Sequence, residues 1–92
     1  MADVIITLKI MPSSPDEDLE KIKNNALEVI KEITGETETR TSVHPVAFGL
    51  QFIQIIFVMD EKKGSTEAME NRIAEIEGIN SVEVTDVRRA IG

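Results

Sequence analysis

Residues 50–59 are apolar on both faces of a two-residue alternation, and this feature restricts the possible folds more than any other. One face holds Ile53, Ile55, Phe57 and Met59, and the other holds Phe52, Ile56 and Val58. Neighbouring side chains of a β-strand point to opposite faces, so both faces of this strand are apolar. Such strands are typical of the interior of a sheet. We therefore expect 50–59 to be a central strand.

Three further segments alternate with the same period. In 3–11, positions 4, 6, 8 and 10 are apolar, whereas positions 7 and 9 are Thr and Lys. In 36–43, Thr and Val alternate mainly with charged residues, which is typical of an edge strand. Pro45 ends this strand, because proline is excluded from a central ladder. In 81–87, the alternation through Val82 and Val84 predicts the last strand.

Two segments have helical periodicity instead. The first begins with Ser14 as the predicted N-cap, Pro15 at the first helical position and Glu17 completing a capping box, and it ends at Gly35. Its apolar stripe is Leu19, Ile22, Ala26, Val29, Ile30 and Ile33. The second follows Ser65 as the predicted cap and ends at Gly78. Its expected buried stripe is Met69, Ile73 and Ile76.

The order of the elements is β-α-β-β-α-β. With right-handed crossovers, the first and third strands lie in the centre and both helices cover one face. The sequence thus predicts one domain over residues 1–92 with a ferredoxin-like α/β sandwich: a four-stranded antiparallel sheet with two helices on one face. The opposite face carries Ile5, Phe52, Ile56 and Val58, and we expect a partner or a second copy to cover this apolar patch.

The charge of the chain excludes several classes of function. Seventeen acidic residues against ten basic ones give a formal net charge of −7, whereas nucleic-acid and anionic-membrane binders normally present a basic face. No apolar run approaches the length of a membrane span, and there is no cysteine. We expect a cytoplasmic protein that meets other proteins, with no direct nucleic acid and no membrane as partner.

Motifs for covalent chemistry or cofactor binding are missing. The sequence has no Gly-x-x-x-x-Gly-Lys-Ser/Thr loop and no Cys-x-x-Cys pair. His44 is the only histidine and precedes Pro45, so a solvated loop position is expected for it. Asp60 and Glu61 beside two lysines indicate a solvated turn. We predict no catalytic residue, no cofactor and no metal.

The segment 45–52, Pro-Val-Ala-Phe-Gly-Leu-Gln-Phe, is the most informative motif. Phe48 between Ala47 and Gly49 has two interpretations: an aromatic that packs over the end of the core, or an exposed anchor for a partner. The segment also mimics an RNA-recognition signature. That interpretation fails because Ala47 replaces the leading basic residue and strand 3–11 has no aromatic to stack a base.

The C-terminal residues include the adjacent pair Arg88 and Arg89 in an otherwise acidic protein. Two interpretations are open. The pair is either part of a frayed, solubilising tail, which is the usual state of a terminus, or a cationic tip for a partner's acidic surface or bound phosphates.

Two motifs together carry a resemblance to a known family. Pro-Val-Ala-Phe-Gly-Leu at 45–50 and Thr-Asp-Val at 85–87 resemble the exchange domain of the elongation factor 1-beta family, and the resemblance covers essentially the whole chain. The length and the ending at 87–90 look like the archaeal form. The resemblance implies a ferredoxin-like fold, no covalent chemistry, and the GDP-bound GTPase elongation factor 1-alpha as partner in translation elongation.

The resemblance also implies where the partner binds. In the family, the loop before the third strand and the C-terminal end touch the GTPase, which by motif match points to Ala47, Phe48 and Gly49, and to Asp86 with Val87. A near-terminal lysine enters the magnesium site in eukaryotic members. The matching position here is Gly92, so that mechanism does not carry over, and Arg88 or Arg89 is the hypothetical substitute.

Two other functions stay open at this point. A ligand-sensing or interaction module is the first alternative, because the ferredoxin-like superfold hosts many functions. RNA binding is the second.

Overall fold

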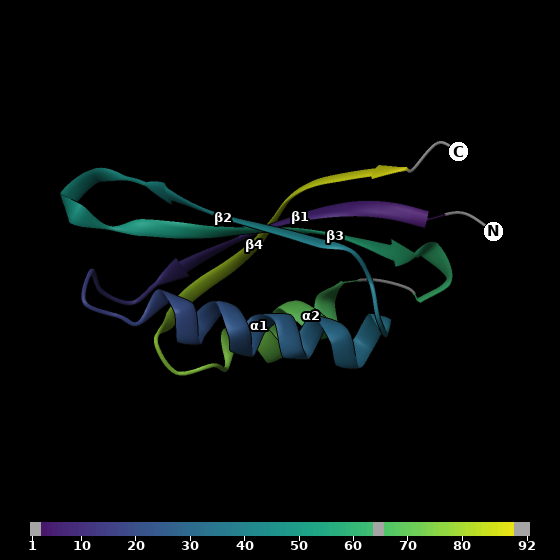
Figure 1. Ribbon diagram of the computed structural model, residues 1–92, viewed down its shortest axis with the longest axis horizontal. Helices are drawn as coiled ribbons and strands as arrows, with labels where there is room; N and C mark the ends of the chain where they lie inside the picture. Colours follow the sequence, from purple (N-terminus) through teal and green to yellow (C-terminus); the bar gives the residue numbers. More distant parts are fainter. Residues whose placement is uncertain (1–2, 64–65, 90–92) are drawn as a thin grey trace.

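The computed structural model describes residues 3–63 and 66–89. The elements are β1 (Asp3–Pro12), α1 (Leu19–Thr34), β2 (Thr39–Pro45), the short 3₁₀ turn η1 (Ala47–Gly49), β3 (Gln51–Asp60), the 3₁₀ turn η2 (Glu61–Lys63), α2 (Glu67–Ala74) and β4 (Ile79–Arg89). The strands form an antiparallel sheet in the order β2-β3-β1-β4, and α1 and α2 lie on the same side of it (Figure 1). The ferredoxin-like prediction is confirmed.

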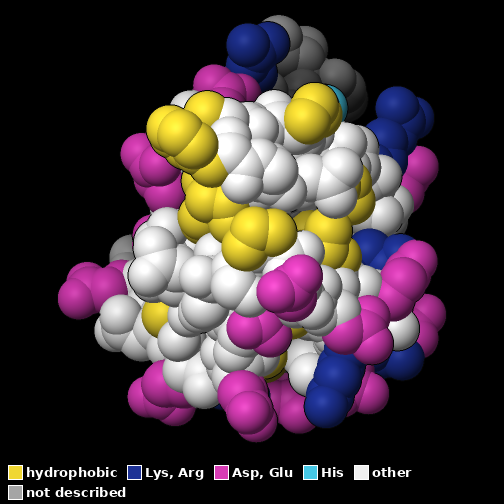
Figure 2. Space-filling model, turned by 90° about the vertical axis from the view of Figure 1, so that its left-hand side faces the viewer, with side chains coloured by type: hydrophobic (Ala, Val, Ile, Leu, Met, Phe, Trp, Pro, Cys, Tyr) yellow, Lys and Arg dark blue, Asp and Glu magenta, His cyan; other side chains and the backbone are white. Residues whose placement is uncertain are grey.

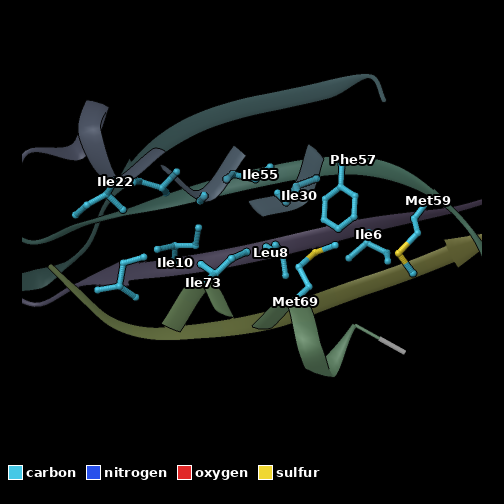
Figure 3. Close-up of a cluster of buried hydrophobic side chains, with 13 residues drawn as sticks. Ile6, Leu8, Ile10, Ile22, Ile30, Ile55, Phe57, Met59, Met69 and Ile73 are labelled. Carbon is cyan, nitrogen blue, oxygen red and sulfur yellow. The ribbon is translucent and has the colours of Figure 1, made fainter. Parts of the chain in front are cut away.

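The core fills the space between the helices and the sheet (Figure 3). Opposed residues of an antiparallel pair share a face, and the rungs Ile6–Phe57 and Leu8–Ile55 bring the two central strands' apolar faces together. The fully buried side chains are Ile6, Leu8, Ile10, Ala26, Ile30, Ile53, Ile55, Phe57, Met69 and Ile73. The central placement of β1 and β3 and their predicted inner faces are therefore confirmed.

Helix α1 starts later than the sequence indicates. The prediction of Ser14 as N-cap is wrong: α1 begins at Leu19, and the carboxylate of Asp18 accepts the amide N–H of Lys21 at 3.2 Å. The Ser14 hydroxyl instead accepts the N–H of Asp16 at 3.3 Å, which closes a local turn. Serine and aspartate both cap helices well, and here the later candidate prevails. The predicted end is confirmed, since the Gly35 N–H donates to the Lys31 carbonyl at 2.8 Å.

The predicted limits shift by at most one residue for β1 and β3, and by two to three residues for β2 and β4. Strand β2 begins at Thr39 instead of 36, because Thr37 approaches the sheet through its side chain, whose hydroxyl donates to the Val58 carbonyl at 2.6 Å. It then runs on to Pro45, which pairs with Gln51 at the outer edge. Strand β4 exceeds the predicted 81–87 by two residues at each end.

Helix α2 is shorter than expected. The predicted cap Ser65 lies outside the described residues, and Thr66 is the N-cap, with its hydroxyl donating to a Glu70 carboxylate oxygen at 2.9 Å. The helix ends at Ala74 rather than continuing towards Gly78. Ile76 still packs against the core, from the turn that follows. In the described part of the chain, no helix is long and apolar enough to cross a membrane.

Candidate partner-binding site

The hairpin that joins β2 and β3 has a compact, hydrogen-bonded tip. The Val46 N–H donates to the Leu50 carbonyl at 2.8 Å, and the Leu50 N–H donates to the Ala47 carbonyl at 3.3 Å. Phe48 and Gly49 both take positive φ angles, of 62° and 75°. The left-handed region is open to glycine but unfavourable for a bulky side chain, so Phe48 carries backbone strain.

This strained backbone presents the Phe48 side chain to solvent. Phe48 is 95% exposed, so the interpretation as an aromatic packed over the core is wrong. Val43 on β2 is also exposed, whereas Val46 and Leu50 at the base of the tip are half-buried. An aromatic ring held in water by a strained turn is an arrangement that packing within the domain does not explain.

The end of the molecule that carries this hairpin has two distinct parts (Figure 2). Hydrophobic side chains gather over the end of the sheet, and acidic side chains dominate below them, over the helices. Acidic side chains also gather around one hollow of the domain, which is lined by Glu17, Asp18 and Glu77 together with Lys21, Ile22 and Asn25. A surface complementary to this end of the molecule would have an apolar pocket for Phe48 and basic residues beside that pocket.

The second predicted contact lies at the end of β4. The rungs to β1 are Asp86 with Thr7, Val87 with Ile6, Arg88 with Ile5 and Arg89 with Val4. Because opposed residues share a face, Asp86 and Arg88 lie on the open face of the sheet, and Arg89 lies on the face that the helices cover elsewhere. The frayed-tail interpretation is wrong for Arg88 and Arg89, which are paired in the sheet. Gly92 lies outside the described residues.

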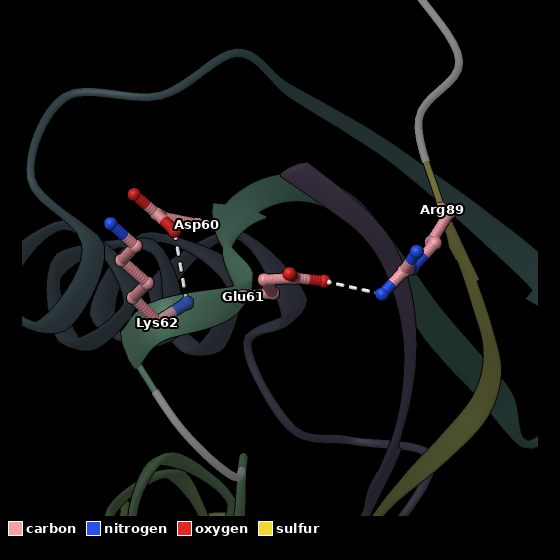
Figure 4. A network of polar contacts seen from close by, with 4 residues as sticks. All are labelled: Asp60, Glu61, Lys62 and Arg89. Carbon is pink, nitrogen blue, oxygen red and sulfur yellow. Dashed lines mark hydrogen bonds and ion pairs between the residues drawn. The ribbon is translucent and has the colours of Figure 1, made fainter. Parts of the chain in front are cut away.

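Both arginines form exposed ion pairs. Arg88 Nε lies 2.8 Å from Asp86 Oδ2, two residues earlier on the same face. Arg89 Nη2 lies 3.1 Å from Glu61 Oε2 in η2 (Figure 4). The two arginine side chains are 76% and 74% exposed, so each pair is weak and open to replacement by another anion. Sequence reasoning missed Glu61 as a partner of Arg89, since a contact between η2 and β4 leaves no local pattern.

The structure does not bring the two groups of predicted residues together. Ala47, Phe48 and Gly49 are at one end of the sheet, and Asp86, Arg88 and Arg89 are at the other (Figure 1). The long dimension of the molecule is 42 Å, against 21 and 18 Å for the others. A single small ligand cannot touch both groups, whereas a protein partner can.

Two other candidate features were metal ligands and the single histidine. The described residues include no group of three or more His, Cys, Asp or Glu side chains placed to hold a metal ion. The expectation of a solvated loop position for His44 is wrong: it lies in β2, half-buried, with its ring stacked on Phe52 at a centroid distance of 5.1 Å. Its Nε2 and the Ser42 hydroxyl are 2.8 Å apart. His44 therefore packs on the open face of the sheet.

The open face is apolar in its middle and charged at its borders. Ile5, Ile56 and Val58 line a hollow of about 300 Å³, which Glu38 and Arg40 border on the β2 side. The predicted apolar character is thus confirmed for this part, and the side chains of the patch, Phe52 included, are half-buried. Coverage of this face by another molecule stays a prediction.

The structure defines a small ferredoxin-like domain with an exposed aromatic side chain at one end and exposed guanidinium groups at the other. Comparison with known proteins gives the particular family. The family model of the EF-1 guanine nucleotide exchange domain matches residues 5–90. The chain belongs to this family.

Relatives match over almost their full length. Elongation factor 1-beta of Methanothermobacter thermautotrophicus is 44% identical over 89 residues, covering 97% of this chain and 98% of the relative. The same factor of Methanocaldococcus jannaschii is 39% identical over 94 residues, covering 98% and 100%.

Solved structures share the fold alone. A de novo designed protein, Foldit4, aligns with a TM-score of 0.64 at 17% identity, covering 98% of both chains. The ACT domain of the GTP pyrophosphokinase of Chlorobium tepidum aligns with a TM-score of 0.55 at 19% identity, covering 89% of this chain and 97% of that one.

Proposed function

We propose that this exchange-factor domain acts on GDP-bound elongation factor 1-alpha in the cytoplasm and accelerates the release of GDP during translation elongation. The membership of the chain in the exchange-domain family supports the activity. Relatives that are named elongation factor 1-beta support the choice of partner. The exposed Phe48 at the hairpin tip is the observation in this chain that carries the proposal furthest.

The physical basis is thermodynamic coupling. A GTPase holds GDP and Mg²⁺ through phosphate charge and ordered loops. A protein that binds the nucleotide-free shape more tightly than the GDP-bound shape must weaken GDP binding by the same factor. Such a protein needs a rigid scaffold and groups that contact the partner, and no covalent step of its own.

The hairpin supplies the anchor in this mechanism. Phe48 is already exposed and is fixed by the hydrogen-bonded turn around it, so little ordering is needed when it enters a pocket of the GTPase. Ala47 and Gly49 are small and let the partner surface approach the backbone. This contact is apolar and depends little on salt.

The end of β4 supplies charge. Arg88 pairs with Asp86 through Nε, and its side chain is 76% exposed, so the guanidinium group remains accessible to a partner. A guanidinium group binds carboxylates and phosphates well, so we assign to Arg88 the contact with a carboxylate or phosphate of the partner's Mg²⁺–nucleotide site. Arg89 pairs with Glu61 of η2 through a terminal nitrogen, so part of its hydrogen-bonding capacity is used within the domain.

The experiment is release of a fluorescent GDP analogue from purified elongation factor 1-alpha, with this protein at substoichiometric concentration. We expect release to accelerate, with each molecule of factor acting on many GTPase molecules. A matched control is Thr41→Ala, in the exposed middle of β2, which should act like the unaltered protein. Unchanged GDP release at all concentrations of the factor would contradict the proposed function.

A further inference from the structure

Strand β4 contains an extra residue next to the contact that we assign to the arginines. Leu8 of β1 pairs with Val84, but the preceding β1 residue, Thr7, pairs with Asp86, so Thr85 has no partner in the ladder. Its hydroxyl lies 3.5 Å from the Thr7 carbonyl oxygen. An extra residue in one strand of an antiparallel pair is a β-bulge, which bends the strand and increases its twist.

The bulge marks the point in β4 beyond which the side chains on the helix-facing side are no longer packed against the core. Before it, Val82 and Val84 pack against the core. After it, Val87 is 57% exposed, although Ile6 on the same rung is 1% exposed. In the ribbon, the last part of β4 lies farther from the helices than its first part (Figure 1). The sequence contains the signal, since the valines change from a spacing of two to a spacing of three.

The bulge also decides what the last rungs place on each face. If Thr85 paired with Thr7 in a regular ladder, Asp86 would move opposite Ile6, towards the buried face. With the extra residue, Asp86 lies opposite Thr7 and Arg88 opposite Ile5, so both side chains lie on the open face.

We propose that Thr85 is a positioning residue for nucleotide exchange: its bulge directs the Asp86–Arg89 end of β4 away from the helices and sets where the guanidinium groups meet the GTPase. This inference rests on the proposed function. The backbone of the extra residue does the positioning, and the hydroxyl contributes little.

Deletion of Thr85 tests the inference. The ladder on either side then joins in register, since Val84 and Asp86 already face consecutive residues of β1. The domain should fold. Arg88 and Arg89 should stay on the same faces of the sheet, but the end of β4 that carries them should point in a different direction. Misplacement of a reacting contact by about 1 Å can lower a rate substantially, and we expect the maximal rate of GDP release to fall about fivefold, as far as removal of Arg88 would lower it.

The concentration of factor that gives half-maximal release should change less than twofold, roughly, because the Phe48 hairpin is untouched. A merely destabilising deletion would instead lower the amount of active protein and leave the maximal rate per folded molecule unchanged. Urea unfolding measured on the same samples separates these two cases.

Three control variants sharpen the test. Asn80 is an extra residue at the other irregularity of the β1–β4 ladder, where Met11 pairs with Ser81 and Pro12 pairs with Ile79. Its deletion should leave exchange unchanged. Thr85→Ala keeps the bulge and should also exchange normally. Deletion of Thr85 in an Arg88→Ala/Arg89→Ala background should cause no further loss, because the groups that the bulge positions are gone. An alanine inserted after Thr85 enlarges the bulge and replaces the deletion if that variant does not fold.

The outcomes distinguish this inference from the function on which it rests. If the unaltered protein fails to release GDP, the proposed function is wrong. If the double arginine variant loses exchange but neither the deletion nor the insertion at Thr85 does, the positioning role alone is overturned. The positioning role also fails if the arginine variants exchange normally, or if the loss on deletion is equal with and without the arginines.

Discussion

The two ends of the sheet present their contact groups in opposite physical ways. At the hairpin, a single aromatic ring is 95% exposed and is held there by a backbone in the left-handed region. At the end of β4, charged side chains lie in a regular ladder and are paired with neighbouring carboxylates. The first region stores strain in the backbone, and the second keeps its charges in weak, replaceable pairs. The difference agrees with the proposal of an apolar anchor at one end and an electrostatic contact at the other.

Truncation of the anchor should have the largest effect. In Phe48→Ala, we expect the loss of a hot-spot aromatic to weaken binding of the GTPase by about 2 kcal/mol, or about thirtyfold in the half-saturating concentration. The free energy of unfolding should stay unchanged, because the ring packs on little of its own domain. Titration of the factor in the GDP-release assay measures the effect. The size of the loss should be equal at low and moderate salt, and a strong salt dependence would remove the contrast between the two ends.

Removal of charge at the other end should have a smaller effect that depends on salt. We expect Arg88→Ala to lower exchange about fivefold, equivalent to about 1 kcal/mol, and Arg89→Ala less than about twofold. The effect of Arg88→Ala should shrink as salt rises, since exposed charges are screened over about 8–10 Å at physiological ionic strength. Equal, small losses for both variants would indicate general steering in place of a directed contact.

The strain at the hairpin can be separated from the ring. Asparagine tolerates the left-handed region, whereas alanine does not, so Phe48→Asn should raise the free energy of unfolding by up to about 1 kcal/mol over Phe48→Ala. Both variants lack the ring and should lose exchange to the same extent. Urea denaturation of the two proteins gives the comparison. Equal stability would show that the turn carries no strain that a side chain can relieve.

The smallest expected effect concerns the pair of Arg89 with Glu61. Glu61→Gln removes an exposed ion pair, so the free energy of unfolding should change by less than about 0.5 kcal/mol. Exchange should stay within about twofold of the unaltered protein, because Arg88 makes the proposed contact. A large gain in exchange would reverse the roles of the two arginines, with Glu61 restraining the active one.

The periodicity of the sequence was sufficient for the fold, because each strand with an inner apolar face has a simple local pattern. The rungs Ile6–Phe57 and Leu8–Ile55 follow from that pattern once β1 and β3 are adjacent. The start of α1 was not predictable in the same way, since both Ser14 and Asp18 are good caps and the choice depends on the preceding loop, whose Ser13 N–H donates to the Gly78 carbonyl.

The candidate site was predictable in its residues but not in its geometry. The motif 45–50 drew attention to Phe48. Its exposure, however, depends on the positive φ angle of its backbone, which the residue types alone do not predict. The spacing of Val84 and Val87 was an available sign of the bulge, yet a bulge is defined by the partner strand. The ion pair to Glu61 and the separation of the two groups depend on the assembled sheet.

The length of the sheet between the two groups has a kinetic consequence. If Phe48 binds the GTPase as proposed, the rigid scaffold holds the β4 end at a fixed place relative to the GTPase, so the second proposed contact becomes an intramolecular event. Its effective concentration is then set by geometry and can exceed the concentration of the free factor by orders of magnitude. Each contact can therefore be weak enough to break quickly, which lets the factor leave once GTP has entered and act again on another GTPase molecule.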